Sequence, residues 1–500
     1  MKRAAHRNAC AIDSMSPRFD QTHRAGQTSG WLLAFGLILG TLGCADPTHD
    51  PVRNVILISC DTLRADRLGM YGYEREVSPN LDAFARQSVV FERAYATAPH
   101  TNPALSSLLT SRMPDELGVS GGNRTLMPSS VSSLPEILAE AGIQSAAIVS
   151  NWALRRPDPK LGDVGIAQGF EHFDDTMGSS AGLREGHFER IADATTDAAI
   201  SWLEQNRNDT DRFFLWVHYQ DPHGPYTPPE RFRGLFTSQG PGGLLPQLGQ
   251  TQDGYRQIPH YQIQDGERRP DFYRNRYDEE IRFFDDEVGR LLAWLESHGV
   301  YEDSLVVFTA DHGESLGEHQ YWFTHEANLY DEEVRVPLVI RYPKGLPSPS
   351  GENLVGHLDF LPSVLDALGL PEVPARGISL IARSLPSGRI LPHSLHRPDS
   401  PQRWFALTDE RYRLVIPRSG PQLYDLREDP AEQRDLAEEN PQRIKAMIDR
   451  YGDFMAVLPT APAVEEIVAP LDDESRRALE ALGYLPARPR ASDAAAKEGP

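Results

Sequence analysis

The stretch VRNVILISCD, residues 52–61, decides the fold of this chain, because it combines a buried strand with a polar residue at its end. The run is apolar, rich in β-branched residues, and stops at Asp61. Such runs are typical of strands that are buried on both faces of a parallel sheet. Open α/β sheets bind their ligands at the carboxyl ends of the strands, so Asp61 stands where a ligand is expected.

Similar apolar runs alternate with helical patterns along the chain. Strand-like runs occupy residues 146–150, 213–219, 304–310 and 337–342, and helical patterns occupy residues 81–91, a segment that starts near Pro103, and residues 277–299. This alternation predicts an α/β fold with a mostly parallel sheet and helices on both faces.

Segments that break this rhythm suggest the domain organisation. The main domain is predicted over residues 52–382, and residues 227–272, rich in Pro, Gly and Gln, indicate an insertion that forms a lid or a specificity wall. Residues 383–485 predict a small strand-rich C-terminal subdomain closed by a helix. The tail, 486–500, has a composition typical of disorder.

The beginning of the chain predicts export. Residues 31–43 form an apolar run behind a leader rich in Arg and His, too short to span a bilayer and suited to a signal peptide over residues 1–43. Cys44 follows where a bacterial lipoprotein is lipidated, and residues 44–51 read as a linker. An ordinary secretory signal, an uncleaved anchor and a start at Met15 are the alternatives. We expect a protein of the periplasm or cell envelope that meets the membrane only through a lipid anchor.

Composition excludes several classes of protein. The chain has 500 residues, with 72 acidic against 50 basic residues and a net charge of -22. Such a charge repels phosphate backbones, so we expect no nucleic-acid partner. The three cysteines, Cys10, Cys44 and Cys60, are too few and too scattered for a disulfide framework or a cysteine metal site.

The stretch FTADHGESLGEH, residues 308–319, carries the strongest chemical signal. A strand ends at Asp311 and His312, and we expect the backbone to turn at Gly313. A surface turn with an incidental histidine is the alternative. Because a second strand ends at Asp61, two acids and one imidazole form a plausible oxygen-rich site for a divalent ion.

Three further histidines lie within or after predicted strands. His218 lies inside the strand of HYQDPHGPYTPP, residues 218–229, and is assigned a structural role, whereas His223 lies in the following loop and is assigned to substrate contact. His325, in WFTHEANLYDEEVRVPL, is placed similarly before a helix and a strand. A capping or surface histidine is the alternative for His325.

Several motifs together resemble one known family. In chain order, from about residue 52 to 485, they are NVILISCDTLRADRLGMYGY, SPNLDAFARQSVVFERAYATAP, SLLTS, DPHGPY, TADHGE, LYDEEVRVPLVI, LYDLREDPAEQRDL and LEALGYL. They resemble the sulfatase family of the alkaline phosphatase superfamily. The resemblance implies a phosphatase-like α/β fold in which a metal-bound nucleophile attacks a sulfate or phosphate ester.

The resemblance also implies a metal site with one divalent ion. Asp61 matches the first ligand of the family, and Asp311 and His312 match the later pair. Thr62 stands where many members carry a second acid. Among zinc, manganese and calcium, an imidazole at residue 312 favours zinc or manganese, because imidazole is a softer ligand than carboxylate.

The nucleophile loop departs from the family pattern. Sulfatases that use formylglycine carry Cys or Ser, any residue, Pro, Ser and Arg, whereas APHTNPALSSLLTS, residues 98–111, aligns Thr101 and Leu105 with the first and last of these. Thr cannot become formylglycine. The resemblance implies that Thr101 is a metal-bound hydroxyl nucleophile, with His223 and His325 stabilising the transferred oxygens or protonating the leaving group. Such a hydroxyl makes phosphoryl transfer easier than sulfuryl transfer.

Three functions remain open from the sequence. The first is a metal-dependent hydrolase of sulfate, phosphate or phosphonate esters on small molecules or glycans, with Thr101 as nucleophile. The second is a phosphoethanolamine-type transferase that acts on an envelope acceptor. The third is a non-catalytic sulfatase-like binding protein, suggested by Thr62, by Leu105, and by Asn151 and Ala153 where sulfatases commonly carry Lys and His.

Overall fold

The computed structural model describes most of the chain from residue 49 onwards. The described ranges are 49–121, 125–161, 164–177, 189–206, 212–237, 246–249, 254–396, 403–458, 467–468, 470 and 472–483. All of them belong to one compact unit, Asp46–Pro500. The predicted signal peptide, Cys44 and the predicted tail lie outside the described residues.

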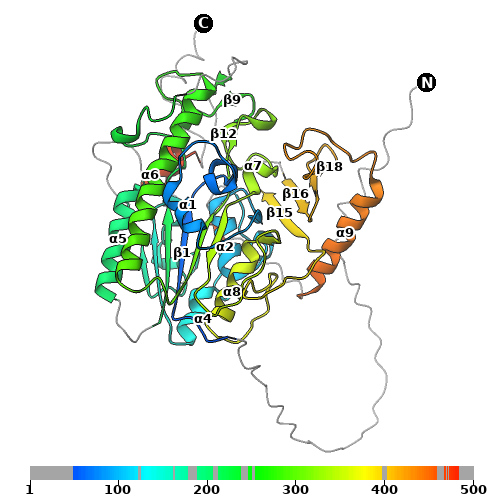
Figure 1. The fold of residues 1–500 in the computed structure, drawn as a ribbon. Coiled ribbons are helices and arrows are strands. Elements are labelled where there is room, and N and C mark those ends of the chain that lie inside the picture. Colours follow the sequence, from blue (N-terminus) through cyan, green and yellow to red (C-terminus); the bar gives the residue numbers. More distant parts are fainter. Residues whose placement is uncertain are drawn as a thin grey trace, which may run out of the picture. The chain divides into compact units, whose positions relative to one another are not determined.

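A seven-stranded sheet organises the described part of the chain (Figure 1). Its order is β2-β13-β10-β1-β7-β5-β6. The bounds are β1 Asn54–Cys60, β2 Val89–Val90, β5 Gln144–Val149, β6 His172–Asp174, β7 Phe213–Tyr219, β10 Ser304–Ala310 and β13 Leu338–Arg341. Strands β10, β1, β7, β5 and β6 are parallel, and β13 runs antiparallel to both β10 and β2. The prediction of a mostly parallel sheet is therefore confirmed.

Strand β1 lies in the middle of this sheet and fixes the position of the site. Every residue of β1 is buried, because it pairs with β10 on one side and β7 on the other. Its last residue, Cys60, pairs with Ala310 of β10 and with Tyr219 of β7. The three strands therefore end at the same edge, and the residues that follow them are brought together.

Helices cover both faces of the sheet, as predicted (Figure 1). Helices α1 Pro79–Ala85, α5 Ala192–Asn206 and α6 Pro270–Ser297 lie on one face, and α2 Thr101–Thr110, α4 Leu134–Glu140 and α8 Phe360–Ala367 lie on the other. Helix α6 is the longest helix among the described residues, and several of its acidic side chains are buried. No helix among the described residues is long and apolar enough to cross a membrane.

Three predicted helices differ from the observed ones at their ends. The pattern over 81–91 stops being helical at Ala85, because Val89 and Val90 pair with β13 as an edge strand, which suits β-branched residues. Helix α2 begins at Thr101, so Pro103 lies within the first turn, where its missing N–H costs no helical hydrogen bond. Helix α6 begins at Pro270, ahead of the predicted residue 277.

The remaining elements are short. The strands are β3 Arg93–Tyr95, β4 Thr125–Leu126, β8 Gln247–Leu248, β9 Gln257–Ile258, β11 Ser315–Leu316, β12 Trp322–Thr324, β14 Leu354–Gly356 and β19 Ile467–Val468. The helices are α3 Pro114–Leu117 and α7 Asp331–Val334, with single turns η1 Ala65–Arg67, η2 Gly69–Tyr71, η3 Trp152–Leu154, η4 Pro159–Leu161, η5 Glu230–Phe232, η6 His260–Gln262, η7 Glu318–Gln320 and η8 His357–Asp359.

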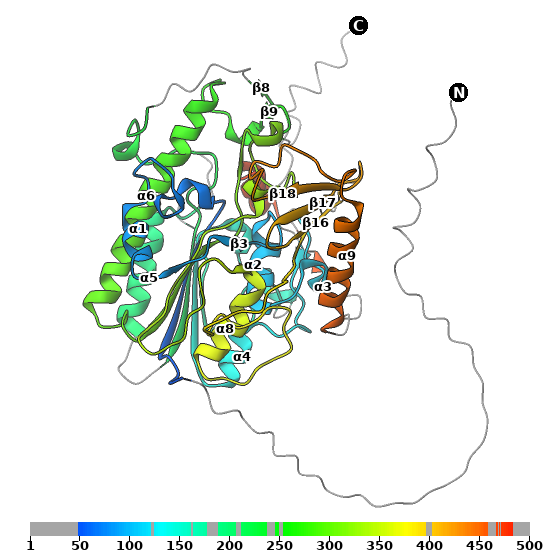
Figure 2. The same cartoon turned by 45° about the vertical axis from the view of Figure 1, so that its right-hand side comes forward.

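A second, antiparallel sheet follows the main one, as the strand-rich C-terminal pattern predicts (Figure 2). It consists of β15 Leu391–His396, β16 Arg403–Thr408, β17 Tyr412–Ile416 and β18 Gln422–Asp425 in that order. Helix α9, Pro441–Ala456, packs on it through Met447, which contacts the same apolar cluster as Leu407 and Leu414. Helix α10, Asp473–Ala481, instead packs against Trp152 of η3.

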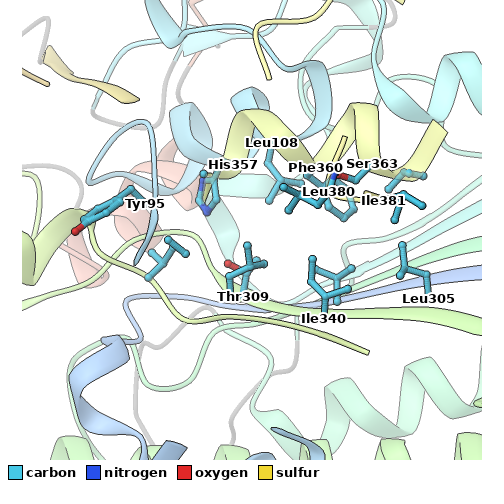
Figure 3. A pocket seen from close by; sticks show the side chains of 16 residues that line it. Tyr95, Leu108, Leu305, Thr309, Ile340, His357, Phe360, Ser363, Leu380 and Ile381 are labelled. Carbon is cyan, nitrogen blue, oxygen red and sulfur yellow. The ribbon is translucent and has the colours of Figure 1, made fainter. Parts of the chain in front are cut away.

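A cavity of about 20 Å³ lies inside the core, between strands β10 and β13 and helix α8 (Figure 3). Leu305, Ile340, Phe360 and Ile381 are among the apolar side chains that line it, with His357 at one end. Its size leaves room for about one water molecule. We therefore regard it as a packing defect of the core and not as a substrate pocket.

Candidate active site

The residues that follow the central strands form a buried cluster of metal-ligand type. Asp61 follows β1, Asp311 follows β10, and His218 lies near the end of β7. One potential ligand atom from each of the three lies within 4.8 Å of those of the other two. His312 Nε2 lies 3.7 Å from Asp61 Oδ1 and 3.5 Å from Asp311 Oδ2. The structure thus brings the three predicted ligands together and adds His218.

Hydrogen bonds orient these side chains. Asp311 Oδ1 accepts from the backbone N–H groups of Thr62, at 3.1 Å, and His312, at 2.7 Å, which leaves Oδ2 facing the His312 ring. His312 Nδ1 donates to the carbonyl oxygen of Gly313 at 2.8 Å, so its Nε2 carries the lone pair. Asn151 Nδ2 donates to Asp61 Oδ2. Partners of this kind fix the orientation of metal ligands.

The electrostatics of the cluster fit a divalent cation. Burial lowers the pKa of His312 to about 4 and that of His218 to about 3, so both imidazoles are neutral at pH 7. Burial also raises the pKa of Asp311, and it raises the pKa of the neighbouring Glu314 to about 8. A bound cation would stabilise the ionised form of these buried carboxyls. The neutral imidazoles beside them can donate lone pairs to the same cation.

The sequence predicts that Gly313 lets the backbone turn at this edge of the sheet. The structure shows a different reason for a glycine there. Gly313 does not adopt the left-handed conformation; a Cβ added to it would lie 2.1 Å from the carbonyl oxygen of Glu332. Glycine is therefore needed at residue 313 for close backbone approach. Thr62 adopts the left-handed conformation instead, with φ of 55°, and its carbonyl oxygen accepts from the hydroxyl of Tyr277 at 2.7 Å.

Thr101, the predicted nucleophile, lies within this cluster. Its hydroxyl is buried, 3.5 Å from Asp61 Oδ2 and 3.4 Å from His312 Nε2. It is the first residue of α2, and the positive end of the helix dipole favours negative charge there. Leu105 is buried on the same helix.

Of the two predicted catalytic histidines, His325 lies beside His312, and His223 lies beside His325. The ring centroid of His325 lies 4.8 Å from that of His312 and 5.0 Å from that of His223. His325 Nδ1 lies 3.4 Å from Glu314 Oε1, and His223 Nδ1 donates to the carbonyl oxygen of Gly224 at 2.6 Å. Every residue predicted for the site is therefore found in one place.

Three further residues of the site, His100, Glu314 and Glu326, were not identified from the sequence. His100 is buried beside Thr101, and its Nε2 lies 2.5 Å from Glu326 Oε1. Glu314 contacts His325. Each of them is one or two positions from a predicted residue, so adjacency in the sequence was the available signal. Asn151, expected near the site, contacts Asp61 directly.

The described part of the 227–272 insertion reaches the site at η6. The ring centroid of Tyr261 lies 6.4 Å from that of His223, and its hydroxyl donates to the carbonyl oxygen of Phe323 at 3.3 Å. Gln262 packs so closely on Gly224 that a Cβ at residue 224 would lie 2.0 Å from Gln262 Nε2. The insertion therefore contacts the loop that carries His223.

Comparisons with known proteins identify the family and support the fold. Residues 53–370 match the family model described as Sulfatase. N-acetylglucosamine-6-O-sulfatase of Bacteroides thetaiotaomicron is 25% identical over 425 residues, covering 68% of this chain and 73% of that protein. Human iduronate 2-sulfatase is 28% identical over 383 residues, covering 67% and 69%. The crystal structure of a phosphonate monoester hydrolase of Agrobacterium radiobacter superposes with a TM-score of 0.66 at 22% identity, covering 82% of this chain and 96% of that one.

Proposed function

This chain belongs to the sulfatase family, and from that premise we propose that it hydrolyses sulfate, phosphate or phosphonate esters with Thr101 as its nucleophile. The observation that carries the proposal is the position of the Thr101 hydroxyl, 3.5 Å from Asp61 and 3.4 Å from His312 Nε2. The relatives include enzymes named for sulfated sugars and one named for a phosphonate monoester. Both ester classes, on a small molecule or a glycan, are therefore candidate substrates.

A divalent ion would be held by Asp61, Asp311 and His312, beside the Thr101 hydroxyl. The donor set fits such an ion, because the His312 imidazole is neutral and burial raises the pKa of Asp311, whose ionised form a cation would stabilise. When bound, the ion supplies Lewis acidity that favours the deprotonated Thr101 oxygen and polarises the oxygens of the ester. Zinc or manganese suits an imidazole ligand better than calcium does.

The first chemical step transfers the acid group to Thr101. The Thr101 oxygen forms a bond to sulfur or phosphorus while the bond to the ester oxygen breaks, and the hydroxyl proton moves to Asp61 Oδ2, 3.5 Å away. The leaving oxygen takes a proton from His223 or His325, and departs as an alcohol. The N–H groups of the first turn of α2 face the charge that develops on the transferred group.

The second step restores the enzyme. A water molecule gives one proton to the same histidine and attacks the sulfur or phosphorus atom. The bond to the Thr101 oxygen breaks, and this oxygen recovers its proton from Asp61. The products are free sulfate, phosphate or phosphonate and the original side chains, so protons and bonds balance over the cycle.

The test is hydrolysis of matched aryl sulfate, phosphate monoester, phosphodiester and phosphonate ester substrates by the metal-loaded protein. We expect Thr101→Ala to lower kcat on the preferred substrate by at least about 1,000-fold, because the nucleophile is removed. Thr110→Ala, at the other end of α2, is the matched control, and should retain most of the activity. A Thr101→Ala enzyme as fast as the parent would rule out this nucleophile, and a parent inactive on all four esters would favour a non-catalytic binding role.

Export through the predicted signal peptide, and a lipid anchor at Cys44, complete the proposal. They rest on the apolar run over residues 31–43 and on the cysteine that follows it. An enzyme anchored in this way would meet its substrate in the periplasm or cell envelope.

A further inference from the structure

One ring nitrogen of His218 is buried and has no hydrogen-bond partner among the described residues. His218 lies within β7 and its side chain is fully buried. Nδ1 lies 2.9 Å from Ser59 Oγ, but Nε2 has no hydrogen-bond partner among the described residues. Buried polar atoms in folded proteins are nearly always satisfied by protein, water or an ion. Nε2 therefore requires a partner that is not a protein side chain.

The ring that carries Nε2 lies close to Asp61 and Asp311. One ligand atom each of His218, Asp61 and Asp311 lies within 4.8 Å of the others. Ligands at about 2.1 Å from one ion lie up to about 4.2 Å apart. The spacing of the three atoms is therefore close to what a single ion requires.

The hydrogen bonds behind the ring select the tautomer that a ligand needs. Trp216 Nε1 donates to Ser59 Oγ at 2.8 Å, and an indole nitrogen can only donate. Ser59 Oγ has a second lone pair, which accepts from Nδ1 of His218. In the opposite tautomer Nε2 would carry a proton, and no acceptor lies within hydrogen-bond distance of it among the described residues.

We propose that His218 Nε2 is a ligand of the divalent ion, alongside Asp61, Asp311 and His312. Many members of the family have an acid at the position of Thr62, whose hydroxyl instead lies beside Glu314. His218 supplies the metal ligand that this acid would provide. The proposal rests on the metal site of the proposed function. Two neutral imidazoles and two carboxylates form a set that prefers zinc or manganese to calcium.

The first test is metal affinity. His218→Asn keeps an amide N–H that can reach Ser59 and removes only the Nε2 position. We expect its affinity for Zn²⁺, measured by chelator competition, to fall by more than the roughly 10–100-fold that loss of an outer partner causes. Ser59→Ala, which removes the group behind the ring, should weaken Zn²⁺ binding by only about 10-fold.

A matched control separates ligation from the general cost of losing a buried imidazole. His393 is also fully buried in a strand, but both of its ring nitrogens are bonded, to the carbonyl oxygen of Ala96 at 2.7 Å and to Thr408 Oγ1 at 2.8 Å. His393→Asn should lower stability and leave Zn²⁺ affinity within about twofold of the parent. Equal Zn²⁺ affinity of His218→Asn and the parent would overturn the inference.

A spectroscopic measurement on the parent avoids the question of whether a variant folds. With ¹¹³Cd²⁺ bound and histidine labelled with ¹⁵N, we expect coupling of cadmium to Nε2 of two imidazoles, those of His218 and His312. Coupling to a single imidazole would overturn the inference and leave the proposed hydrolase intact. Two coupled imidazoles in a protein that hydrolyses no ester would instead contradict the proposed function alone.

Discussion

At the scale of single residues, backbone carbonyl oxygens orient the imidazoles of this site. The carbonyl oxygen of Gly313 fixes the tautomer of the neutral His312, and that of Gly224 accepts from Nδ1 of His223, which orients its ring. A different arrangement is found at His319, outside the metal cluster. Its Nδ1 lies 2.9 Å from Glu332 Oε1, its Nε2 lies 3.2 Å from the carbonyl oxygen of Glu432, and its ring stacks on Tyr330. Acceptors at both nitrogens favour the imidazolium.

The pairing of His319 predicts a dependence of stability on pH. The hydrogen bond and charge of Glu332 outweigh the effect of burial and raise the pKa of His319 from 6.5 to about 8. The contribution to the free energy of unfolding is therefore full below pH 6.5 and is lost as the pH rises through 8. We expect about 1 kcal/mol, allowing for solvent screening of a partly exposed pair.

Urea unfolding of the parent and of His319→Gln at pH 6, 7, 8 and 9 measures this contribution. The difference in stability between the two proteins should shrink between pH 6.5 and 8. Glu332→Gln should reduce the change with pH of this stability difference, because it removes the carboxylate that pairs with His319. His298→Gln, at the exposed end of α6, should leave that change as it is. A difference that stays constant with pH would contradict the assignment.

At the scale of elements, α10, the last helix among the described residues, packs next to a segment that contacts the site. Helix α10 packs Leu479 and Leu482 against Trp152 of η3, and the residue before Trp152 is Asn151, which donates to Asp61. The short strand β19 pairs with β4, and the carbonyl oxygen of Thr125 in β4 accepts from Asn102 Nδ2 at 2.7 Å. The end of the chain therefore supports two segments that contact the nucleophile helix and the metal cluster.

Loosening α10 should therefore lower activity without removing a residue of the site. Leu479→Ala deletes a side chain that is 4% exposed, and should cost about 2 kcal/mol of local stability. We expect faster amide exchange over residues 473–482, and a several-fold lower kcat because Asn151 is held less firmly. Ile448→Ala, on the exposed face of α9, is the control. Unchanged exchange and unchanged kcat in Leu479→Ala would refute this support.

At the scale of the whole molecule, a buried ion pair joins the C-terminal sheet to the main sheet region. Arg413 of β17 is fully buried, with Nη2 3.0 Å from Asp331 Oδ1 and Nη1 3.6 Å from Glu432 Oε1. Its guanidinium lies 4.9 Å from the ring centroid of Tyr95. Asp331 belongs to α7, which follows His325, so this pair also fixes the segment behind the site.

Breaking this pair should destabilise the protein strongly. Arg413→Met leaves the buried Glu432 carboxyl without its cation, although the half-buried Asp331 keeps Arg335 at 3.6 Å, and should lower the free energy of unfolding by about 3–5 kcal/mol. Adding Glu432→Gln should recover part of the loss, because one uncompensated charge is removed. Arg434→Met, which removes an exposed pair with Glu439, should change little. Urea unfolding measures all three variants, and a loss below about 1 kcal/mol in Arg413→Met would contradict the role of the pair.

The sequence by itself determined five of the seven strands of the main sheet, whereas β2 lay in a predicted helix and β6 was not predicted. Continuous apolar runs such as residues 213–219 and 304–310 can only be buried on both faces, so their extents match β7 and β10. Asp61 and Asp311 follow strands β1 and β10, His223 and His325 lie in loops, and Thr101 begins α2, all positions that such a sheet gathers at one edge.

Only the tertiary structure decided which buried histidine faces the acids and why the turn needs glycine. A strand pattern places His218 inside β7, but the register of β1 between β7 and β10 brings its ring to Asp61 and Asp311. Gly313 is required by the approach of Glu332 from α7, a contact between segments that the local sequence does not encode. Distances between separate strands depend on packing, and packing is a property of the folded chain as a whole.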